Sequence, residues 1–176
     1  MTILETDRLY LREYTENDLE GLSEIFSDEA VMKYIGKGGV LDKAYAKLHI
    51  DTWSKKLYGQ FGFGLWAMIF KENNMLIGQC GFNILKETSE VEIAYLLAKN
   101  YWGKGIATEI SGATADYGFR VLSLKKIVAI AYKQNQASIN VIRKLGMKYE
   151  GEKVFFGKNL ESFSLIPGDF YKTRSV

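Results

Sequence analysis

Apolar side chains recur along this chain with two different periods, and the changes of period mark out its strands and helices. Within residues 8–14, Leu9 and Leu11 alternate with polar positions, which predicts a first strand. From Thr15 onward the apolar positions follow at helical spacing, so a helix is predicted to run to about Ser27. The chain is therefore expected to open with a strand and then a helix.

A second helix is predicted from Asp42, a residue type that suits an N-cap, to about Gly59. Its apolar residues recur at the spacing of a buried stripe. The stripe consists of Ala46, Ile50, Trp53 and Leu57. His49, the sole histidine, falls among the polar positions of this helix and is interpreted as structural or exposed.

The rest of the chain alternates between extended and helical patterns. The predicted elements, in chain order, are strands at 64–70, 75–82 and 90–97, a helix at 106–121, a strand at 127–132, a helix from Asn135 to Leu145, and a closing hairpin of 148–156 and 161–166. Hairpins join neighbouring strands in an antiparallel way, whereas the helix at 106–121 makes a crossover. The sequence therefore predicts an α+β fold with a mixed, mostly antiparallel sheet.

Length and composition limit the class of protein. The chain has 176 residues, of which 47% are hydrophobic and 25% charged, proportions typical of a soluble globular protein. One domain spanning 1–176 is expected. The longest nearly apolar run, 61–70, is much shorter than a membrane span, and the start of the chain does not resemble a secretory signal. With a single cysteine, Cys80, the sequence favours a reducing cytoplasm.

Charge and side-chain chemistry narrow the class further. With 23 Lys and Arg against 21 Asp and Glu, the net charge is +2, which argues against a dedicated nucleic-acid-binding protein. One histidine and one cysteine rule out a multi-histidine or thiolate metal site, so no metal is expected. The chemistry is therefore expected from carboxylates, hydroxyls, tyrosines and backbone amides.

A glycine turn is the strongest local signal in the sequence. Gly103 and Gly105 lie between a predicted strand and a predicted helix, where backbone N–H groups and the helix dipole favour a phosphate or pyrophosphate. The same pattern also fits a turn that needs glycine only for its shape. Two known phosphate motifs do not match, because Ala98 stands where a Walker A loop has its first glycine and Thr108 where a dinucleotide fingerprint has its third.

The surroundings of this turn resemble a known family. The stretch 92–109, followed by 135–138 and 144–147, resembles the acyl-CoA-binding core of the GNAT N-acetyltransferases. It is most similar to the branch that contains the ribosomal-protein N-terminal acetyltransferases, which also shares the segments 5–12 and 76–81. The resemblance covers nearly the whole chain. It implies a central sheet flanked by helices on both faces, with a splayed strand pair that holds acyl-CoA.

The resemblance also implies how acetyl-CoA binds. Backbone groups of Tyr95 and Leu97 would bond to the pantetheine arm. The pyrophosphate would lie against the amides of the glycine turn, which consists of Trp102, Gly103, Lys104, Gly105, Ile106, Ala107 and Thr108. Asn135 would reach the cofactor arm, and Lys104 or Lys144 would neutralise phosphate charge, although both lysines equally suit solvated helix ends.

The implied reaction transfers an acetyl group to a primary amine, which attacks the thioester directly in a ternary complex. The amine must first lose a proton, and Glu92 on the splayed strand is the candidate base and acceptor contact; its alternative is a cross-strand or surface carboxylate. Many members of the family protonate the leaving thiolate with a tyrosine at the position of Ile142. Ser138, which matches the serine of this branch, is the candidate donor, and it equally suits a local bond in its helix.

The sequence leaves the identity of the acceptor amine and the oligomeric state open. Tyr34 is a candidate lining residue of the acceptor pocket, which the glycine-rich loop 36–41 would shape. A protein N-terminus, an aminoglycoside, a polyamine and another small amine all fit the sequence. Gly157 stands where some relatives have a second glutamate, and with Ile142 it favours the alternative of a catalytically silent acyl-CoA sensor. A monomer, or a homodimer paired through the closing hairpin, is expected.

Overall fold

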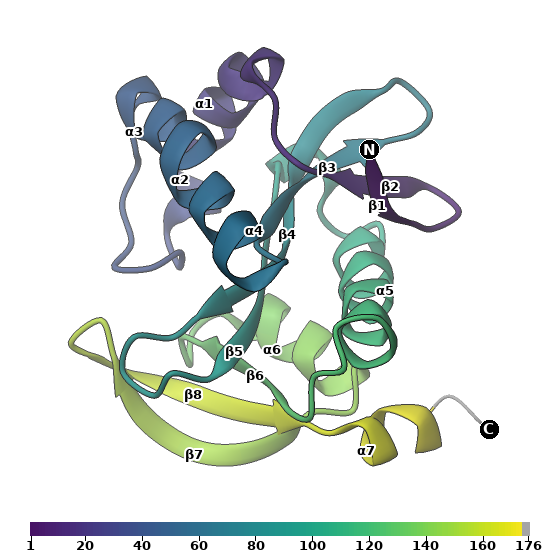
Figure 1. Cartoon of the computed structure of the whole chain (residues 1–176). Helices are drawn as coiled ribbons and strands as arrows, with labels where there is room; N and C mark the ends of the chain where they lie inside the picture. The colour runs from purple at the N-terminus through teal and green to yellow at the C-terminus, as the bar shows by residue number, and fades with distance from the viewer. Residues whose placement is uncertain (174–176) are drawn as a thin grey trace.

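One mixed sheet organises the fold, as the computed structural model in Figure 1 shows for residues 1–173, the part of the chain that the structure describes. Its strands are β1 (Thr2–Glu5), β2 (Leu9–Arg12), β3 (Leu65–Phe70), β4 (Met75–Ile84), β5 (Val91–Leu97), β6 (Ile127–Ala131), β7 (Lys148–Phe155) and β8 (Lys158–Leu165). Within these residues they lie in the order β1-β2-β3-β4-β5-β6-β8-β7, and every neighbouring pair except β5 with β6 is antiparallel. The predicted α+β class with a mostly antiparallel sheet is confirmed.

Helices cover both faces of the sheet (Figure 1). The helical segments are η1 (Glu16–Asp18), α1 (Leu19–Ser27), α2 (Glu29–Met32), α3 (Lys43–Leu48), η2 (His49–Ser54), α4 (Lys55–Phe61), η3 (Lys99–Tyr101), α5 (Ile106–Arg120), α6 (Gln136–Lys144) and α7 (Pro167–Lys172). Buried residues of α1, α2 and α3, such as Leu22, pack with Leu96 on one face. Buried residues of α5, α6 and α7, such as Ile110 and Ile142, form the core on the other.

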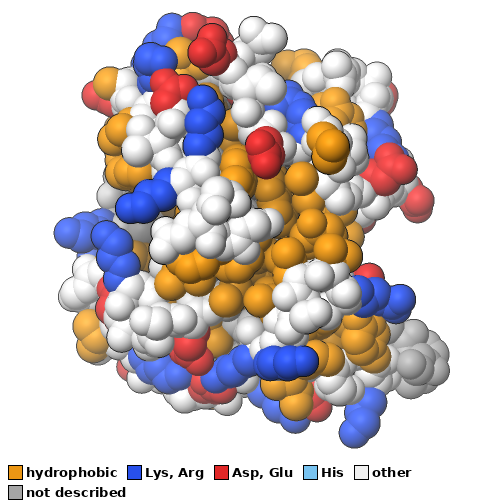
Figure 2. Space-filling model, in the orientation of Figure 1, with side chains coloured by type: hydrophobic (Ala, Val, Ile, Leu, Met, Phe, Trp, Pro, Cys, Tyr) orange, Lys and Arg blue, Asp and Glu red, His pale blue; other side chains and the backbone are white. Residues whose placement is uncertain are grey.

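The surface between these layers is partly apolar. In the space-filling view, hydrophobic side chains gather across the middle of one face, beside α4 and α5, and charged side chains stand around them (Figure 2). Phe61 at the end of α4 is 40% exposed and stacks on Phe63, with ring centroids 5.6 Å apart. Apolar surface of this kind borders the site described below.

β5 and β6 separate in the middle of the sheet. In the described chain these parallel neighbours share one paired position, Glu92 with Val128. β5 pairs with β4, in contrast, along its whole length from Val91 to Leu97. The two strands therefore meet at one end and diverge toward the other, which is the splayed pair that the resemblance implies.

Three short elements differ from the sequence prediction. β1 and α2 have four residues each and α7 has six, which is too short for a hydrophobic period to be read. The strand predicted within residues 8–14 is therefore β2, the second strand of the structure. The closing hairpin turns at Phe156 and Gly157, with φ of +56° and +74°, so β8 begins at Lys158 instead of 161. A turn of two residues with positive φ is shorter than the loop that the prediction placed here. The start of β8 is polar and therefore resembles a loop in the sequence.

A π-helical turn changes the second predicted helix. α3, η2 and α4 form one continuous segment, which ends at Gly62 with φ +71° instead of near Gly59. A π turn contains more residues than an α turn, so the inward-facing positions shift after Ile50. Ser54 is 1% exposed, whereas Trp53, predicted to belong to the buried stripe, is 40% exposed. The prediction for Trp53 is therefore wrong.

The same turn decides the position of His49. Its side chain is 7% exposed and packs edge-on against Tyr14 and Phe26, with ring centroids 5.6 Å away in both contacts. His49 is thus a buried, structural residue, and the exposed alternative is excluded.

Candidate active site

A large cavity of about 1350 Å³ lies where β5 and β6 separate. Nearly all the predicted site residues line it. Those residues are Tyr34, Glu92, Tyr95, Leu97, Trp102, Gly103, Gly105, Ile106, Ala107, Thr108, Asn135, Ser138 and Lys144. Lys104 does not belong to the lining formed by residues 1–173; its ammonium lies 5.4 Å from the ring centroid of Tyr101. The fold brings segments that are far apart in the sequence into one site.

The glycine turn presents unpaired backbone amides to this cavity. Gly103 and Gly105 both adopt φ of +74°, and Gly105 is the N-cap of α5. Within the described residues no side chain caps the helix, and the Glu109 N–H makes the bond to the Gly105 carbonyl at 3.0 Å. The amides of 106–108 precede that bond and are free to meet an anion at the positive end of the helix dipole.

Trp102 differs from its predicted role. Its N–H donates to the Lys99 carbonyl at 3.1 Å, so this amide is not free for a phosphate. Its indole Nε1–H donates to the Leu97 carbonyl at 2.7 Å. The tryptophan therefore fixes the end of β5 with its side chain, and the free amides of the turn begin after it, at Gly103.

An ionic cluster from the first hairpin holds the glycine turn, and the sequence analysis missed it. Arg8 donates from Nη1 to the Lys104 carbonyl at 2.8 Å, and its Nη2 lies 2.5 Å from Glu109 Oε2. Thr6 Oγ1 donates to the other oxygen of Glu109 at 2.5 Å. Burial by itself would raise the pKa of Glu109, but the bonds from Thr6 and Arg8 outweigh burial and lower it. The only signal in the sequence was the resemblance of the segment 5–12.

The free edge of β5 supplies further backbone groups. The Ala98 N–H bonds to the Ile77 carbonyl beside β4 at 2.8 Å. Because polar backbone groups alternate in direction along a strand, those of Tyr95 and Leu97 point away from β4, toward the gap. The Leu97 carbonyl already accepts the bond from the Trp102 indole.

Glu92 lies where β5 and β6 meet and is 8% exposed. Burial raises the pKa of Glu92 to about 8; the Asn83 side chain offsets part of this through a hydrogen bond, and the negative charge of Glu87 adds to it. The alternative of a surface carboxylate is excluded. A carboxyl group whose pKa lies near neutrality inside a cavity can exchange a proton with a bound molecule.

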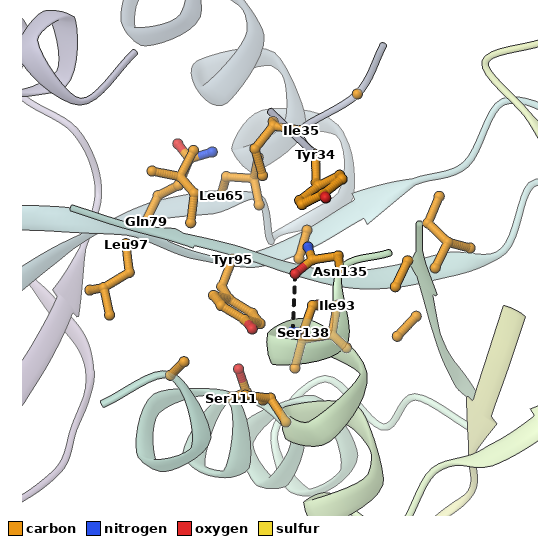
Figure 3. A pocket seen from close by; sticks show the side chains of 18 of the residues that line it. Tyr34, Ile35, Leu65, Gln79, Ile93, Tyr95, Leu97, Ser111, Asn135 and Ser138 are labelled. Atoms are coloured by element: carbon orange, nitrogen blue, oxygen red, sulfur yellow. Dashed lines mark hydrogen bonds between the residues drawn. The ribbon is translucent and has the colours of Figure 1, made fainter. Parts of the chain in front are cut away.

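Tyr95 directs its side chain to the other side of β5, toward α5 and α6 (Figure 3). Burial raises the pKa of the Tyr95 hydroxyl, and the neighbouring Ser138 hydroxyl offsets part of this rise. The phenol is therefore protonated at neutral pH and can donate. Ser111 Oγ, which also lines the cavity, has no hydrogen-bond partner among the described residues. The sequence analysis gave Tyr95 a backbone role alone and missed its hydroxyl.

The start of α6 is built as the sequence predicts. Asn135 accepts the Ser138 N–H through Oδ1 at 3.3 Å and so caps the helix (Figure 3). Ile142, which stands at the position of the family tyrosine, is 4% exposed and lines the cavity with apolar atoms.

At the other end of the cavity, Tyr34 contacts Tyr132 at the end of β6, with ring centroids 5.7 Å apart. The Tyr132 hydroxyl donates to the Gly36 carbonyl at 2.7 Å. Gly36 and Leu41, at the two ends of the loop 36–41, line the cavity. Within residues 1–173, no group of three His, Cys, Asp or Glu side chains could hold a metal ion, and no helix is long and apolar enough to span a membrane.

Comparisons with known proteins identify the family. A family model of the acetyltransferase (GNAT) domain matches residues 8–148. The chain is 33% identical over 150 residues to an uncharacterized N-acetyltransferase, YoaA, of Bacillus subtilis, covering 85% of this chain and 84% of that one. It is 30% identical to the spermidine N(1)-acetyltransferase of Escherichia coli, covering 81% and 74%. The chain therefore belongs to the GNAT acetyltransferases.

Solved structures agree with this assignment. A GNAT-family acetyltransferase of Bacillus anthracis superposes with a TM-score of 0.79 at 27% identity, covering 94% of this chain and 98% of that one. A ribosomal L7/L12 α-N-protein acetyltransferase in complex with coenzyme A gives a TM-score of 0.77 at 20% identity, covering 94% and 98%, and shows the shared fold. The protein is an acyltransferase, and its family transfers acetyl groups from acetyl-CoA to amines.

The ionisation of Glu92 predicts how stability depends on pH. Its pKa in the fold is raised above the ordinary value of 4.5, so its contribution to stability is complete below about pH 4.5 and is lost as the pH rises through about 8. Glu92→Gln keeps a polar neutral group and removes this loss. We expect the thermal midpoint of the variant to exceed that of the ligand-free protein by on the order of 5 °C at pH 8.5, and to match it at pH 5. Equal midpoints at both pH values would contradict a buried carboxyl with a raised pKa.

Proposed function

We propose that this protein catalyses transfer of an acetyl group from acetyl-CoA to a primary amine, by direct attack of the amine in a ternary complex. The observation that carries the proposal is the cavity at the splayed strands, which joins free amides of the glycine turn to the buried carboxyl of Glu92. One domain, without a metal, performs the reaction. We place it in the cytoplasm, as a monomer or homodimer that needs neither nucleic acid nor membrane.

The donor half of the cavity fits acetyl-CoA. The amides of Gly103 and of 106–108 face an anion with the helix dipole behind them, which suits the pyrophosphate. The backbone groups of Tyr95 and the N–H of Leu97 would bind the pantetheine arm across the gap. Lys144, at the end of α6, lines the same cavity and would neutralise phosphate charge.

Glu92 acts as the base. An amine is mostly protonated at neutral pH, so one proton must leave before the nitrogen can attack. Glu92, once ionised, accepts this proton directly or through a water. The nitrogen then forms a bond to the acetyl carbon, and the bond from that carbon to sulfur breaks. The amide nitrogen releases its second proton to solvent, from which the group that protonates the thiolate regains its own. A pKa of about 8 suits this task better than that of an ordinary glutamate, because it lies nearer to the pKa of the amine that Glu92 deprotonates.

Tyr95 and Ser138 protonate the leaving thiolate. Their hydroxyls lie together on the face of β5 opposite Glu92, where Ile142 offers none (Figure 3). Either group keeps its proton at neutral pH and can give it to a thiolate whose pKa is about 8.5. The proton taken by Glu92 and the proton given to sulfur thus travel by separate routes.

The donor site is tested by Gly105→Glu. A carboxylate there would repel the pyrophosphate and fill the cradle of free amides, so we expect calorimetry to show acetyl-CoA affinity reduced by at least about tenfold. Gly157→Glu is the matched control, because Gly157 has the same φ of +74° and open space for a side chain, at the turn between β7 and β8. Comparable losses in both variants would place the donor elsewhere.

The base is tested by the pH–rate profile of Glu92→Gln. We expect kcat near pH 7 to fall by about a hundredfold, and the loss to shrink as the pH rises and the free amine becomes common. The measurement is thiol release from acetyl-CoA with a saturating amine. If the variant kept the profile of the unmodified enzyme, Glu92 would not be the base.

The thiolate donor is tested by comparing Tyr95→Phe with Ser138→Ala. We expect Tyr95→Phe to lower kcat by about a hundredfold with little change in KM for acetyl-CoA, and Ser138→Ala to lower it less, because Ser138 supports the phenol. A larger loss for Ser138→Ala would make the serine the direct donor. Unchanged kcat in both variants would mean that water protonates the thiolate.

A further inference from the structure

The part of the cavity that lies beside Glu92, here called the acceptor end, differs in chemistry from a polyamine site. We propose that the acceptor is a small amine with a single positive charge and an aromatic or apolar body; this rests on the proposed acetyltransferase function and specifies its substrate. Four features of the acceptor end carry the inference: the face on which it lies, its aromatic wall, its charge and its cover.

The acceptor end lies on one face of β5. Side chains alternate along a strand, so Glu92 and Leu96 point to the same face. Leu96 packs there with Leu22 and Phe26 of α1. Tyr95 points to the opposite face, toward α5 and α6 (Figure 3). An amine placed beside Glu92 therefore lies on the face of the sheet that α1, α2 and α3 cover.

Aromatic rings form a wall at this end. The wall consists of Phe26, Tyr45, His49 and Trp53, all of which line the cavity. Neighbouring rings meet edge to face, with centroids 4.8 Å apart for Tyr45 and Trp53 and 5.6 Å for Phe26 and His49. Burial lowers the pKa of His49 to about 4, with Gln79 offsetting part of the effect, so the wall carries no charge at neutral pH. It suits an apolar body.

The π-helical turn creates this wall. Without the extra residue of η2, Trp53 would continue the buried stripe of the helix; with it, His49 and Ser54 turn inward and Trp53 remains 40% exposed at the cavity. A half-exposed indole held against the Tyr45 ring is preformed for contact with a flat or apolar ligand.

The charge of the lining excludes a second ammonium group. Glu92 is the only carboxylate among the described residues that line the cavity, and its role as base already requires it. Lys33, Lys56 and Lys86 line the same cavity. The nearby Glu87 stays outside the lining and accepts the Phe156 N–H at 2.9 Å. A second ammonium group would lose its hydration without gaining a carboxylate partner, and it would lie near the positive charges of these lysines. Both effects disfavour binding.

Contacts across the acceptor end favour a small molecule over a protein N-terminus. The Tyr132 hydroxyl donates to the Gly36 carbonyl at 2.7 Å, and Lys158 Nζ donates to the Lys37 carbonyl at 2.8 Å. These bonds tie the loop after α2 to the end of β6 and to the start of β8. A peptide needs an open groove for the residues that follow its amino group, and this cover obstructs such a groove.

Paired substrates test the inference. Pentylamine and 1,5-diaminopentane have the same carbon chain and differ in the second amino group, and 2-phenylethylamine adds a ring. We expect kcat/KM, measured by thiol release, to be at least about tenfold higher for pentylamine than for the diamine, and highest for 2-phenylethylamine. Higher values for the diamine or for spermidine, or for a short peptide with a free apolar N-terminus, would overturn the inference and leave acetyl transfer intact.

Two variants connect this preference to the named residues. Trp53→Ala should raise KM for 2-phenylethylamine by about tenfold without changing KM for acetyl-CoA. Tyr149→Ala, which truncates a 55% exposed ring on β7, is the matched control. Lys56→Glu adds a carboxylate to the lining and should raise kcat/KM for the diamine relative to pentylamine by about fivefold. Lys55→Glu, its neighbour outside the lining, makes the same charge change and should not.

Failure of the inference and failure of the proposed function give different results. If acetyl-CoA binds but no amine, diamine or peptide is acetylated, the proposed transfer and the inferred acceptor are both wrong. If amines are acetylated and Trp53→Ala behaves like Tyr149→Ala, the transfer stands and the acceptor site lies elsewhere. Normal thermal midpoints of the variants ensure that either result concerns the site and not folding.

Discussion

The chemistry of this molecule depends on one incomplete pairing in its sheet. Interior strands normally satisfy their backbone groups on both edges, yet β5 and β6 share only the pair of Glu92 and Val128 within the described chain. The crossover through α5 holds the two strands in the same sheet while their ends diverge. The open edges and the glycine turn then offer main-chain donors and acceptors to the same cavity.

Alternation along β5 separates the two halves of the site. Glu92 points to the face of α1 and α3, whereas Tyr95 points to the face of α5 and α6, so a carboxyl and a phenol three residues apart in the chain never compete for one position. Burial disfavours the charged form of each, for opposite uses: it makes the carboxyl a stronger base and keeps the phenol protonated. The two faces of β5 thus give the carboxyl of Glu92 and the phenol of Tyr95 separate environments.

The features that could be predicted from the sequence are those that depend on long hydrophobic periods or on local rules such as helix capping. The helix over 106–121, the cap at Asn135 and the antiparallel strands appear nearly where expected, because their spacing repeats over several turns or positions. The π-helical turn could not be predicted, since the pattern of the second helix continues smoothly through it. The burial of Glu92 and the hydroxyl role of Tyr95 depend on neighbours from distant segments. The cluster of Arg8 and Glu109 spans a hundred and one positions, and no local pattern reports it.

That cluster joins the beginning of the chain to the site. Glu109 stands in the first turn of α5, where its charge alone would weaken attraction for an anion; Arg8 cancels it and also holds the Lys104 carbonyl. Binding at the glycine turn and closure of the first hairpin are therefore thermodynamically linked. If the turn holds the pyrophosphate as proposed, loosening the bond between Thr6 and Glu109 lowers the affinity of the turn for that anion, and the bound anion stabilises the hairpin in return. Under the proposed function, the turn between β1 and β2, remote from the reacting atoms, thus helps to set how tightly the enzyme holds its donor.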